Sequence, residues 1–210
     1  TPLALIIGPA ERLLEADRAL TPEAQVETAQ VIARNARMLL KHVNDLLDIS
    51  KLEAGKLSIA VLPTDISALV RFVASHFEVL AADRGVRLDI RTQKPVVAAA
   101  DPEKLQRVVM NLLSNAFKFA PRSGTVRIEA AAVGDRVVIS VDDSGPGVKR
   151  ELRKVIFERF RQGDGGTDRQ ISGTGLGLAI ALEFVELHKG TIEVLDSDLG
   201  GARFEISVPL

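Results

Sequence analysis

The sequence has no cysteine among its 210 residues. That absence excludes disulfides, thiolate zinc sites and a cysteine nucleophile, and it fits a protein of the reducing cytosol. No apolar run approaches the length of a membrane span, about eighteen residues, and no signal peptide is visible. An excess of charge is missing too, since 27 Lys and Arg against 28 Asp and Glu leave a formal net charge of −1. No overall field therefore points to nucleic acid or an anionic membrane as a partner.

What is present describes an ordinary globular protein, with 46% hydrophobic and 26% charged residues. The length allows one large domain or two small ones. The chain opens on Thr1-Pro2-Leu3 rather than on Met. We therefore expect a piece of a longer, cytoplasmic protein that makes no membrane contact here and leaves an upstream membrane anchor open.

A helical hairpin is predicted for the first fifty-odd residues. An apolar stripe at helical spacing runs from Pro2 to about Ala19. Thr21-Pro22 is a cap followed by a first-turn proline, and a second, long helix runs from there to about Glu53. The apolar face of this helix is wider than one partner helix covers, so we predict a homodimeric four-helix bundle. A hairpin packed on the chain's own second domain is the alternative.

The rest of the chain predicts a second domain, which follows a hinge between Glu53 and Lys56. Period-two alternation predicts strands at 57–61, 86–90, 95–99, 126–130, 137–141, 191–195 and 204–208. Helical spacing predicts helices at 66–80, 101–119, 151–157 and 176–188. Strands in hairpins with a few helices make an α+β sandwich, in which one mixed sheet carries helices on one face.

The predicted helix 101–119 carries the first chemical signal. Beside its apolar stripe, Asn111, Asn115 and Lys118 lie four and three residues apart and share a separate face. Neutral amide oxygens suit a hard divalent cation held together with phosphate, and an ammonium group suits the phosphates themselves. An ordinary polar helix face is the alternative.

Three glycine-rich stretches add to this signal. Asp142 to Gly147 directly follows a strand, and one of its two carboxylates could accept a hydrogen bond from the amino group of a base. Residues 163–170 form a polar, patternless run that suggests a lid over a ligand. Gly173 to Leu178 leads straight into a helix, where backbone N–H groups favour anions. Each stretch alone is weak evidence, because a plain turn has the same composition.

In this order the stretches are specific, and the chain resembles the sensor histidine kinases of two-component systems, within the ATPases that share the Bergerat fold. The matching segments are the N box at 111–119, the G1 box at 143–147, the F box at 157–160 and the G2 box at 173–177. The resemblance covers essentially the whole chain. It implies a dimerisation and histidine-phosphotransfer hairpin at 1–54 and a catalytic ATP-binding domain at 55–210.

The resemblance implies ATP and Mg²⁺ as cofactors. Asn115 would be the magnesium ligand, Phe119 would stack beside the adenine, and Asp143 would accept from its amino group. Residues 163–172 would form the ATP lid, with Arg161 or Gln162 near the γ-phosphate. The implied cofactor-binding residues are Asn111, Asn115, Lys118, Phe119, Asp143, Gly145, Gly147, Phe160, Arg161, Gln162, Gly173, Thr174, Gly175, Leu176, Gly177 and Leu178.

One position separates the branches of this wider group. Its hydrolytic members, such as gyrase, the heat-shock chaperone and the mismatch-repair ATPases, carry a Glu where this chain has Asn111. That Glu is the general base for water, whereas Asn cannot take a proton, so the resemblance implies a site that would bind ATP without hydrolysing it. The phosphoryl group is then available to an imidazole by in-line transfer, with Mg²⁺ neutralising charge.

The family's phosphoacceptor lies in an H box of the form H-E-x-x-(T/N)-P-L, whose last three letters match the start of this chain. We expect the acceptor upstream, and Thr1 would be the residue that orients water in a phosphatase reaction. His42, His76 and His188 do not match the motif, so each is expected to be structural or solvated. This chain is therefore expected to bind ATP without phosphorylating itself, as the core of a kinase that passes phosphate to an Asp of a response regulator. A degenerate Bergerat scaffold or pseudokinase, and a serine-kinase relative of the anti-sigma or mitochondrial dehydrogenase-kinase type, are the alternatives.

Overall fold

The computed structural model of the protein describes residues 2–14, 21–92, 94–161 and 174–210. The chain divides into two compact units, Thr1–Leu57 and Ser58–Leu210. Among the described residues, no helix combines the length and the apolar character needed to cross a membrane.

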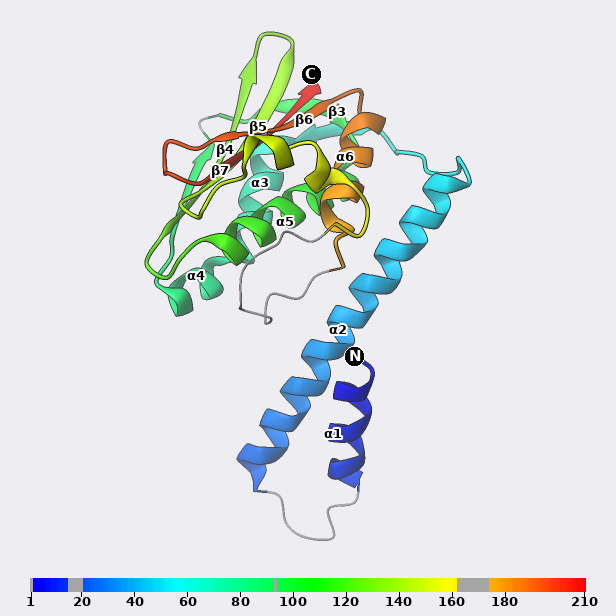
Figure 1. Ribbon diagram of the computed structural model, residues 1–210. Coiled ribbons are helices and arrows are strands. Elements are labelled where there is room, and N and C mark those ends of the chain that lie inside the picture. Colours follow the sequence, from blue (N-terminus) through cyan, green and yellow to red (C-terminus); the bar gives the residue numbers. More distant parts are fainter. Residues whose placement is uncertain (1, 15–20, 93, 162–173) are drawn as a thin grey trace. The chain divides into compact units, whose positions relative to one another are not determined.

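The first unit is a pair of helices lying side by side, α1 (Ala4–Leu14) and α2 (Pro22–Glu53) (Figure 1). Thr21 caps α2 as predicted, because its hydroxyl oxygen accepts from the Ala24 N–H at 3.3 Å. Many large apolar side chains of this unit remain exposed in the single chain, namely Leu3 just before α1 and, on the two helices, Leu5, Ile7, Leu14, Val26, Leu40, Val43, Leu46 and Leu47. The predicted end of the first helix, near residue 19, lies outside the described residues.

The second unit is built on a five-stranded mixed sheet in the order β2-β4-β5-β7-β6. Its strands are β2 (Arg87–Thr92), β4 (Thr125–Val133), β5 (Arg136–Asp143), β6 (Thr191–Asp196) and β7 (Ala202–Pro209). β2 runs parallel to β4, and the other neighbours are antiparallel. A separate two-stranded ribbon pairs β1 (Leu62–Asp65) with β3 (Val97–Ala100).

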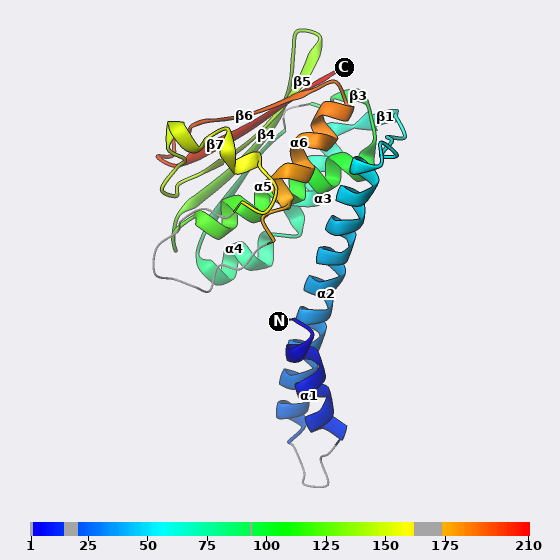
Figure 2. The same ribbon diagram turned by 45° about the vertical axis from the view of Figure 1, so that its right-hand side comes forward.

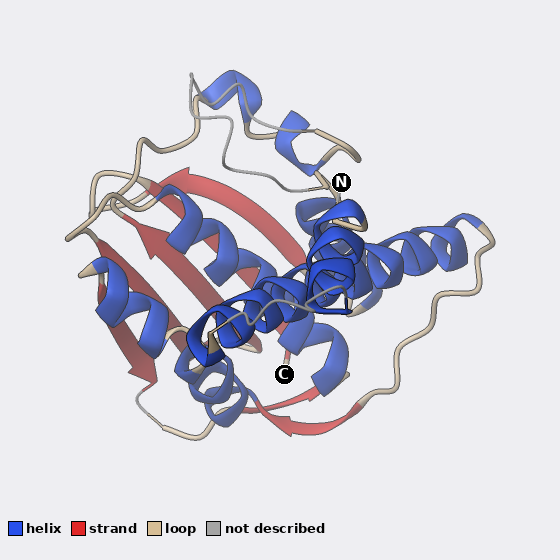
Figure 3. Ribbon diagram, turned by 90° about the horizontal axis from the view of Figure 1, so that it is seen from below, coloured by secondary structure: helices blue, strands red, loops and turns tan. Residues whose placement is uncertain are grey.

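Four helices cover one face of the sheet, as Figures 2 and 3 show. They are α3 (Ile66–Ser75), α4 (Glu78–Arg84), α5 (Pro102–Phe119) and α6 (Gly177–Leu187). The predicted class, a mixed sheet with helices on one face, is confirmed. The predicted stripe of α5 lies in the core between helices and sheet, where Leu105, Val108, Val109, Leu112 and Leu113 have no exposed surface.

Three predicted elements are wrong in detail. Residues 57–61 do not form a strand, because the N–H of Ala60 donates to the Asp101 carboxylate and sheet pairing begins only at Leu62. The helix predicted at 66–80 is two helices, since the chain tightens at His76 and turns the Phe77 ring onto Phe117, with ring centroids 5.1 Å apart.

The short helix predicted at 151–157 is instead two single 3₁₀ turns, η1 (Arg150–Leu152) and η2 (Val155–Phe157). The i→i−3 bonds that close them, from Leu152 N to Lys149 O and from Glu158 N to Val155 O, do not continue into an α-helical ladder.

Candidate functional site

Helix α5 presents the three polar side chains that its sequence placed on one face. Asn111 is buried, and its Nδ2 donates to the carbonyl of Gly177, at the start of α6, over 3.1 Å. Asn115 and Lys118 are half-buried one and two turns further along. Burial lowers the pKa of the Lys118 amine, and no carboxylate of the described chain lies within ion-pair distance of it. Within the described part of the chain, the helix therefore offers an amine without a carboxylate partner beside two amides.

Phe119 ends α5 and is 43% exposed, and Lys118 Nζ lies 5.2 Å from the centre of its ring. An exposed aromatic ring beside a half-buried amine can stack on a flat ligand that carries negative charge elsewhere.

The two aspartates at the end of β5 point to opposite faces of the sheet, because side chains alternate along a strand. Asp143 pairs with Val126 in the register and so shares the face that the helices cover. Its Oδ1 accepts from the N–H of Gly145 at 2.7 Å and from the N–H of Ala202 at 3.3 Å. Its Oδ2 accepts no hydrogen bond from the described residues.

The environment of Asp143 disfavours its negative charge. The residue is 3% exposed, and burial raises the pKa of its carboxyl group. The hydrogen bonds from Gly145 and Ala202 lower the pKa but do not outweigh that burial. Oδ2 has no donor among the described residues, so it can accept a hydrogen bond from the amino group of a ligand.

Asp142 belongs to a different arrangement on the opposite face. The strand register sets Asp89, Arg127, Asp142 and Arg203 side by side across β2, β4, β5 and β7, so that charge alternates in sign. Asp142 is fully buried, and its two oxygens accept from Ser197 Oγ at 2.8 Å and from Arg203 Nη1 at 3.4 Å. Asp142 is therefore engaged within the sheet through both oxygens, whereas Asp143 has a donor on only one oxygen among the described residues.

Gly145 is where the G1 turn meets the end of α5. A Cβ on Gly145 would lie 2.7 Å from the Phe119 carbonyl oxygen and 2.8 Å from Asp143 Oδ1. Only glycine fits such an approach, which brings Phe119 and Asp143 to the two sides of one turn. Gly147 follows with φ +71° and packs against the backbone of Gly201.

The turn between β6 and β7 was not predicted from the sequence to belong to the site. It packs directly against Asp143. A Cβ on Gly201 would lie 2.5 Å from the Gly145 nitrogen, and Ser197 anchors the same turn to Asp142. Gly200-Gly201 is visible in the sequence only as a hairpin turn. Its distance of nearly sixty residues from the G1 box leaves no local signal of this contact.

The described part of the G2 box packs against the chain around the F box. Gly175 has φ +71°, and a Cβ there would lie 2.6 Å from the Phe160 carbonyl carbon and 2.8 Å from the Arg161 oxygen. Leu176 is buried, and its N–H donates to Thr174 Oγ1 at 3.3 Å. α6 then begins at Gly177, and Leu178 is half-buried in its first turn.

The two phenylalanines of the F box, Phe157 and Phe160, do not lie on one helix. η2 ends at Phe157, and Phe160 has a left-handed backbone with φ +61° and a ring 66% exposed. Arg161 is exposed beside it. Thr1, Gln162, Gly173 and the predicted lid at 163–172 lie outside the described residues.

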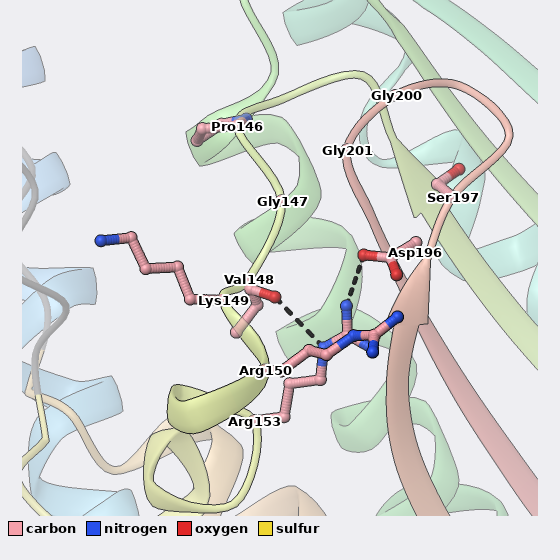
Figure 4. A pocket seen from close by; sticks show the side chains of 10 residues that line it. All are labelled: Pro146, Gly147, Val148, Lys149, Arg150, Arg153, Asp196, Ser197, Gly200 and Gly201. Atoms are coloured by element: carbon pink, nitrogen blue, oxygen red, sulfur yellow. Dashed lines mark hydrogen bonds and ion pairs between the residues drawn. The ribbon is translucent and has the colours of Figure 1, made fainter.

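A hollow of about 290 Å³ borders the G1 turn (Figure 4). It lies between residues 146–153 and the β6–β7 turn, and Gly147 and Gly201 belong to its wall. Arg153 spans it, donating through Nε to the Val148 carbonyl at 3.1 Å and pairing with Asp196. This link fixes the segment after the G1 box to the end of β6.

The donor set fits a magnesium ion that arrives together with a nucleotide. The described residues contain no group of three His, Asp or Glu side chains that could hold a metal on its own. Mg²⁺ binds through one or two protein oxygens together with substrate phosphates and water, so a single amide oxygen of Asn115 suits it.

The comparisons with known proteins identify the family of the chain. The family described as "Histidine kinase-, DNA gyrase B-, and HSP90-like ATPase" matches residues 100–210, and the His Kinase A (phospho-acceptor) domain matches residues 1–55. The second unit thus has the Bergerat ATPase fold. The chain belongs to the histidine kinase-, DNA gyrase B- and HSP90-like ATPase family, in the branch of the two-component sensor histidine kinases.

Two similar relatives are hybrid signal transduction histidine kinase D of Dictyostelium discoideum, 44% identical, and the sensor histidine kinase TmoS of Ectopseudomonas mendocina, 43% identical. The matches cover all of this chain but only 14% and 22% of those proteins. The solved structure of full-length ShkA in complex with AMPPNP matches with a TM-score of 0.75 at 31% identity, covering 99% of this chain and 42% of that one.

Proposed function

We propose that this chain is the catalytic core of a sensor histidine kinase, which binds ATP with Mg²⁺ in the second unit. In the longer protein, the γ-phosphoryl group would pass to a histidine and from there to an aspartate of a response regulator. The observation that carries the proposal is the convergence of the N, G1 and G2 boxes. Asn111 bonds Gly177, and Gly145 joins Phe119 to Asp143.

Asp143 is proposed to recognise the adenine. Its Oδ1 is held by two backbone N–H groups, which leaves Oδ2 to accept from the adenine amino group. A guanine presents a carbonyl oxygen at the equivalent position, and a carboxylate there would repel it. Phe119 offers the neighbouring aromatic surface.

Asn115, Asn111 and Lys118 are proposed to face the phosphates. The half-buried amine of Lys118 gains a counter-charge when a triphosphate binds, which favours its protonated form. When bound, Mg²⁺ would neutralise charge on the β- and γ-phosphates. The backbone N–H groups at the start of α6 would supply further donors to the phosphates.

Asn111 supports phosphoryl transfer rather than hydrolysis. An amide cannot remove a proton from water, and its Nδ2 is already committed to the Gly177 carbonyl. The hydrogen bonds of His76 and His188 support a structural role for both histidines. His188 is 6% exposed with both ring nitrogens in hydrogen bonds, and His76 Nδ1 bonds the Phe72 carbonyl. The chain by itself is therefore expected to bind ATP without becoming phosphorylated.

The first unit is proposed to dimerise and to meet the response regulator. Its exposed apolar residues on α1 and α2 would be covered by the same residues of a second copy in a four-helix bundle. The proposed boundary separates a phosphotransfer hairpin, residues 1–54, from a catalytic domain, residues 55–210. Thr1 would orient the attacking water in a phosphatase reaction.

The test is a titration with a fluorescent ATP analogue, with and without Mg²⁺. Asn115→Ala should remove the Mg²⁺-dependent part of the affinity, and Ser114→Ala, an exposed neighbour on the same helix, is the matched control. A protein extended to include an H-box histidine should then take up acid-labile label from γ-labelled ATP. Binding without labelling would indicate the pseudokinase alternative, and no binding would refute the nucleotide site.

A further inference from the structure

His188 occupies a position that the proposed mechanism does not use. It caps the C-terminal end of α6 and is 6% exposed. Its Nδ1 lies 2.6 Å from the Phe184 carbonyl, and a carbonyl can only accept, so Nδ1 carries the proton. Nε2 then accepts from the backbone N–H of Asp101 at 2.9 Å. The ring is thus a neutral bridge between two backbone groups.

Asp101 connects the same point to a third segment. It is the N-cap of α5, and its Oδ1 accepts from the N–H of Lys104 at 3.1 Å. Its Oδ2 accepts from the N–H of Ala60 at 2.8 Å. Burial by itself raises the pKa of the Asp101 carboxyl, but the N–H groups of Ala60 and Lys104 and the Lys104 charge outweigh it and hold that pKa below its ordinary value. Asp101 therefore stays ionised and keeps both bonds at neutral pH.

Helices α5 and α6 are thus joined at two separate points. His188 bonds Asp101 at one point, and Asn111 bonds Gly177 at the other. Along α5 these points are ten residues apart, roughly 15 Å at 1.5 Å per residue. Between them, the guanidinium of Arg107 lies 5.2 Å from the centre of the Phe184 ring. A shift of α6 along α5 would break both end contacts.

We propose that His188 is a positioning residue that sets the register of α6 on α5. It thereby places the described part of the G2 box, residues 174–177, opposite Asn111. Through Asp101 the same bridge holds Ala60, three residues after Leu57, the last residue of the helical unit. ATP binding at α5 and α6 is then expected to affect the segment around Ala60 as well, because the bridge joins that segment to both helices. This role rests on the proposed function, because it concerns the placement of the proposed phosphate loop.

Two substitutions at His188 separate the bridge from the local bond. His188→Gln places its side-chain oxygen near the position of Nε2 and can still accept from Asp101. His188→Asn places its amide nitrogen near Nδ1, so it keeps the bond to Phe184 but leaves the Asp101 N–H without its acceptor. His76→Asn is the matched control, because His76 is exposed and makes the same i−4 bond to its own helix, to the Phe72 carbonyl at 2.9 Å.

The first measurement is the affinity for a fluorescent ATP analogue in variants that circular dichroism shows to be folded. We expect His188→Asn to bind about tenfold more weakly, the loss expected when about 1.4 kcal/mol of alignment is removed. His188→Gln should stay within about threefold of the wild type, and His76→Asn should be unchanged. Equal affinities for the two His188 variants would overturn the proposal.

The second measurement is amide hydrogen exchange at Ala60, whose side chain is exposed and whose N–H is protected by Asp101. A non-hydrolysable ATP analogue should slow this exchange in the wild type but not in His188→Asn. Asp101→Ser keeps an N-cap hydroxyl and the backbone bond to His188 but cannot reach Ala60, so it should bind nucleotide normally and lose the effect at Ala60.

Persistence of that effect in Asp101→Ser would refute the coupling, and this variant decides the question if His188→Asn fails to fold. A wild type that binds no nucleotide would instead refute the proposed function itself, and with it any role for His188 in that function.

Discussion

Replacing Asp143 by Asn tests the central claim about the site. The change of one oxygen to an NH₂ group should weaken nucleotide binding and stabilise the protein without nucleotide. Asn keeps the shape of the side chain, and its Oδ1 can still accept from Gly145 and Ala202. The second position becomes an NH₂ group, a donor facing the proposed adenine amino group. A hydrogen bond to a charged acceptor contributes about 1.5–3 kcal/mol. We therefore expect the dissociation constant for an ATP analogue to rise about 10- to 150-fold.

The same substitution should stabilise the protein without nucleotide. Burial raises the pKa of Asp143 in the folded state, so the folded protein favours the neutral form and ionisation costs stability at neutral pH. That cost is fully present above the raised pKa and disappears as the pH falls below the unfolded value of about 3.9. Asn never carries the charge, so Asp143→Asn should resist urea better than the wild type at pH 7, and the difference should shrink toward pH 4.

The control is Asp142→Asn, on the other face of the sheet. Both oxygens of Asp142 are engaged, and a new NH₂ group would face either the Ser197 hydroxyl or the Arg203 guanidinium. This variant should lose stability while binding nucleotide nearly as well as the wild type. Urea unfolding from pH 4 to pH 7 and fluorescence titration measure both effects. If Asp143→Asn were the less stable protein at pH 7, the carboxylate would already be compensated and the assignment of Asp143 would be wrong.

Three further predictions follow from other contacts. Gly145→Ala should weaken nucleotide binding more than tenfold, since its Cβ would overlap backbone and carboxylate oxygens. The control is Gly134→Ala, where φ is +64° and no atom lies within 4 Å of the Cβ; it should cost roughly 1–2 kcal/mol of stability and leave binding unchanged in the same titration. Ser197→Ala should lower the free energy of unfolding by about 1–3 kcal/mol, because it leaves a buried oxygen of Asp142 without its donor. An unchanged midpoint of urea unfolding would contradict the role given to the β6–β7 turn. Leu40→Asp should shift the protein from dimer to monomer in light scattering, since Leu40 is 61% exposed in the single chain, and an unaltered mass would place the dimer interface elsewhere.

The sequence by itself determined the features that depend on near neighbours. Thr21-Pro22 marks the start of α2, and Thr21 caps that helix as predicted. The helix predicted to start at Asp101 begins there, with Asp101 as its N-cap. The apolar stripe of α5 and the alternating strands fixed the fold class, because helical and strand periodicities can be read within a few residues. The order of the four boxes pointed to the kinase family, which the comparisons show.

Only the tertiary structure decided the features that depend on distant partners. The dipeptide Asp142-Asp143 does not reveal that its two carboxylates have different surroundings. In the structure, Ser197 donates to Asp142, whereas Ala202 and Gly201 lie against Asp143. Their contribution comes from a turn more than fifty residues away, where no local pattern marks it. The bridge from His188 to Asp101 is equally invisible in the sequence, where the histidine reads as an ordinary helix end. Propensity and periodicity describe how a segment folds, whereas hydrogen bonds between segments depend on where the sheet and helices bring them together.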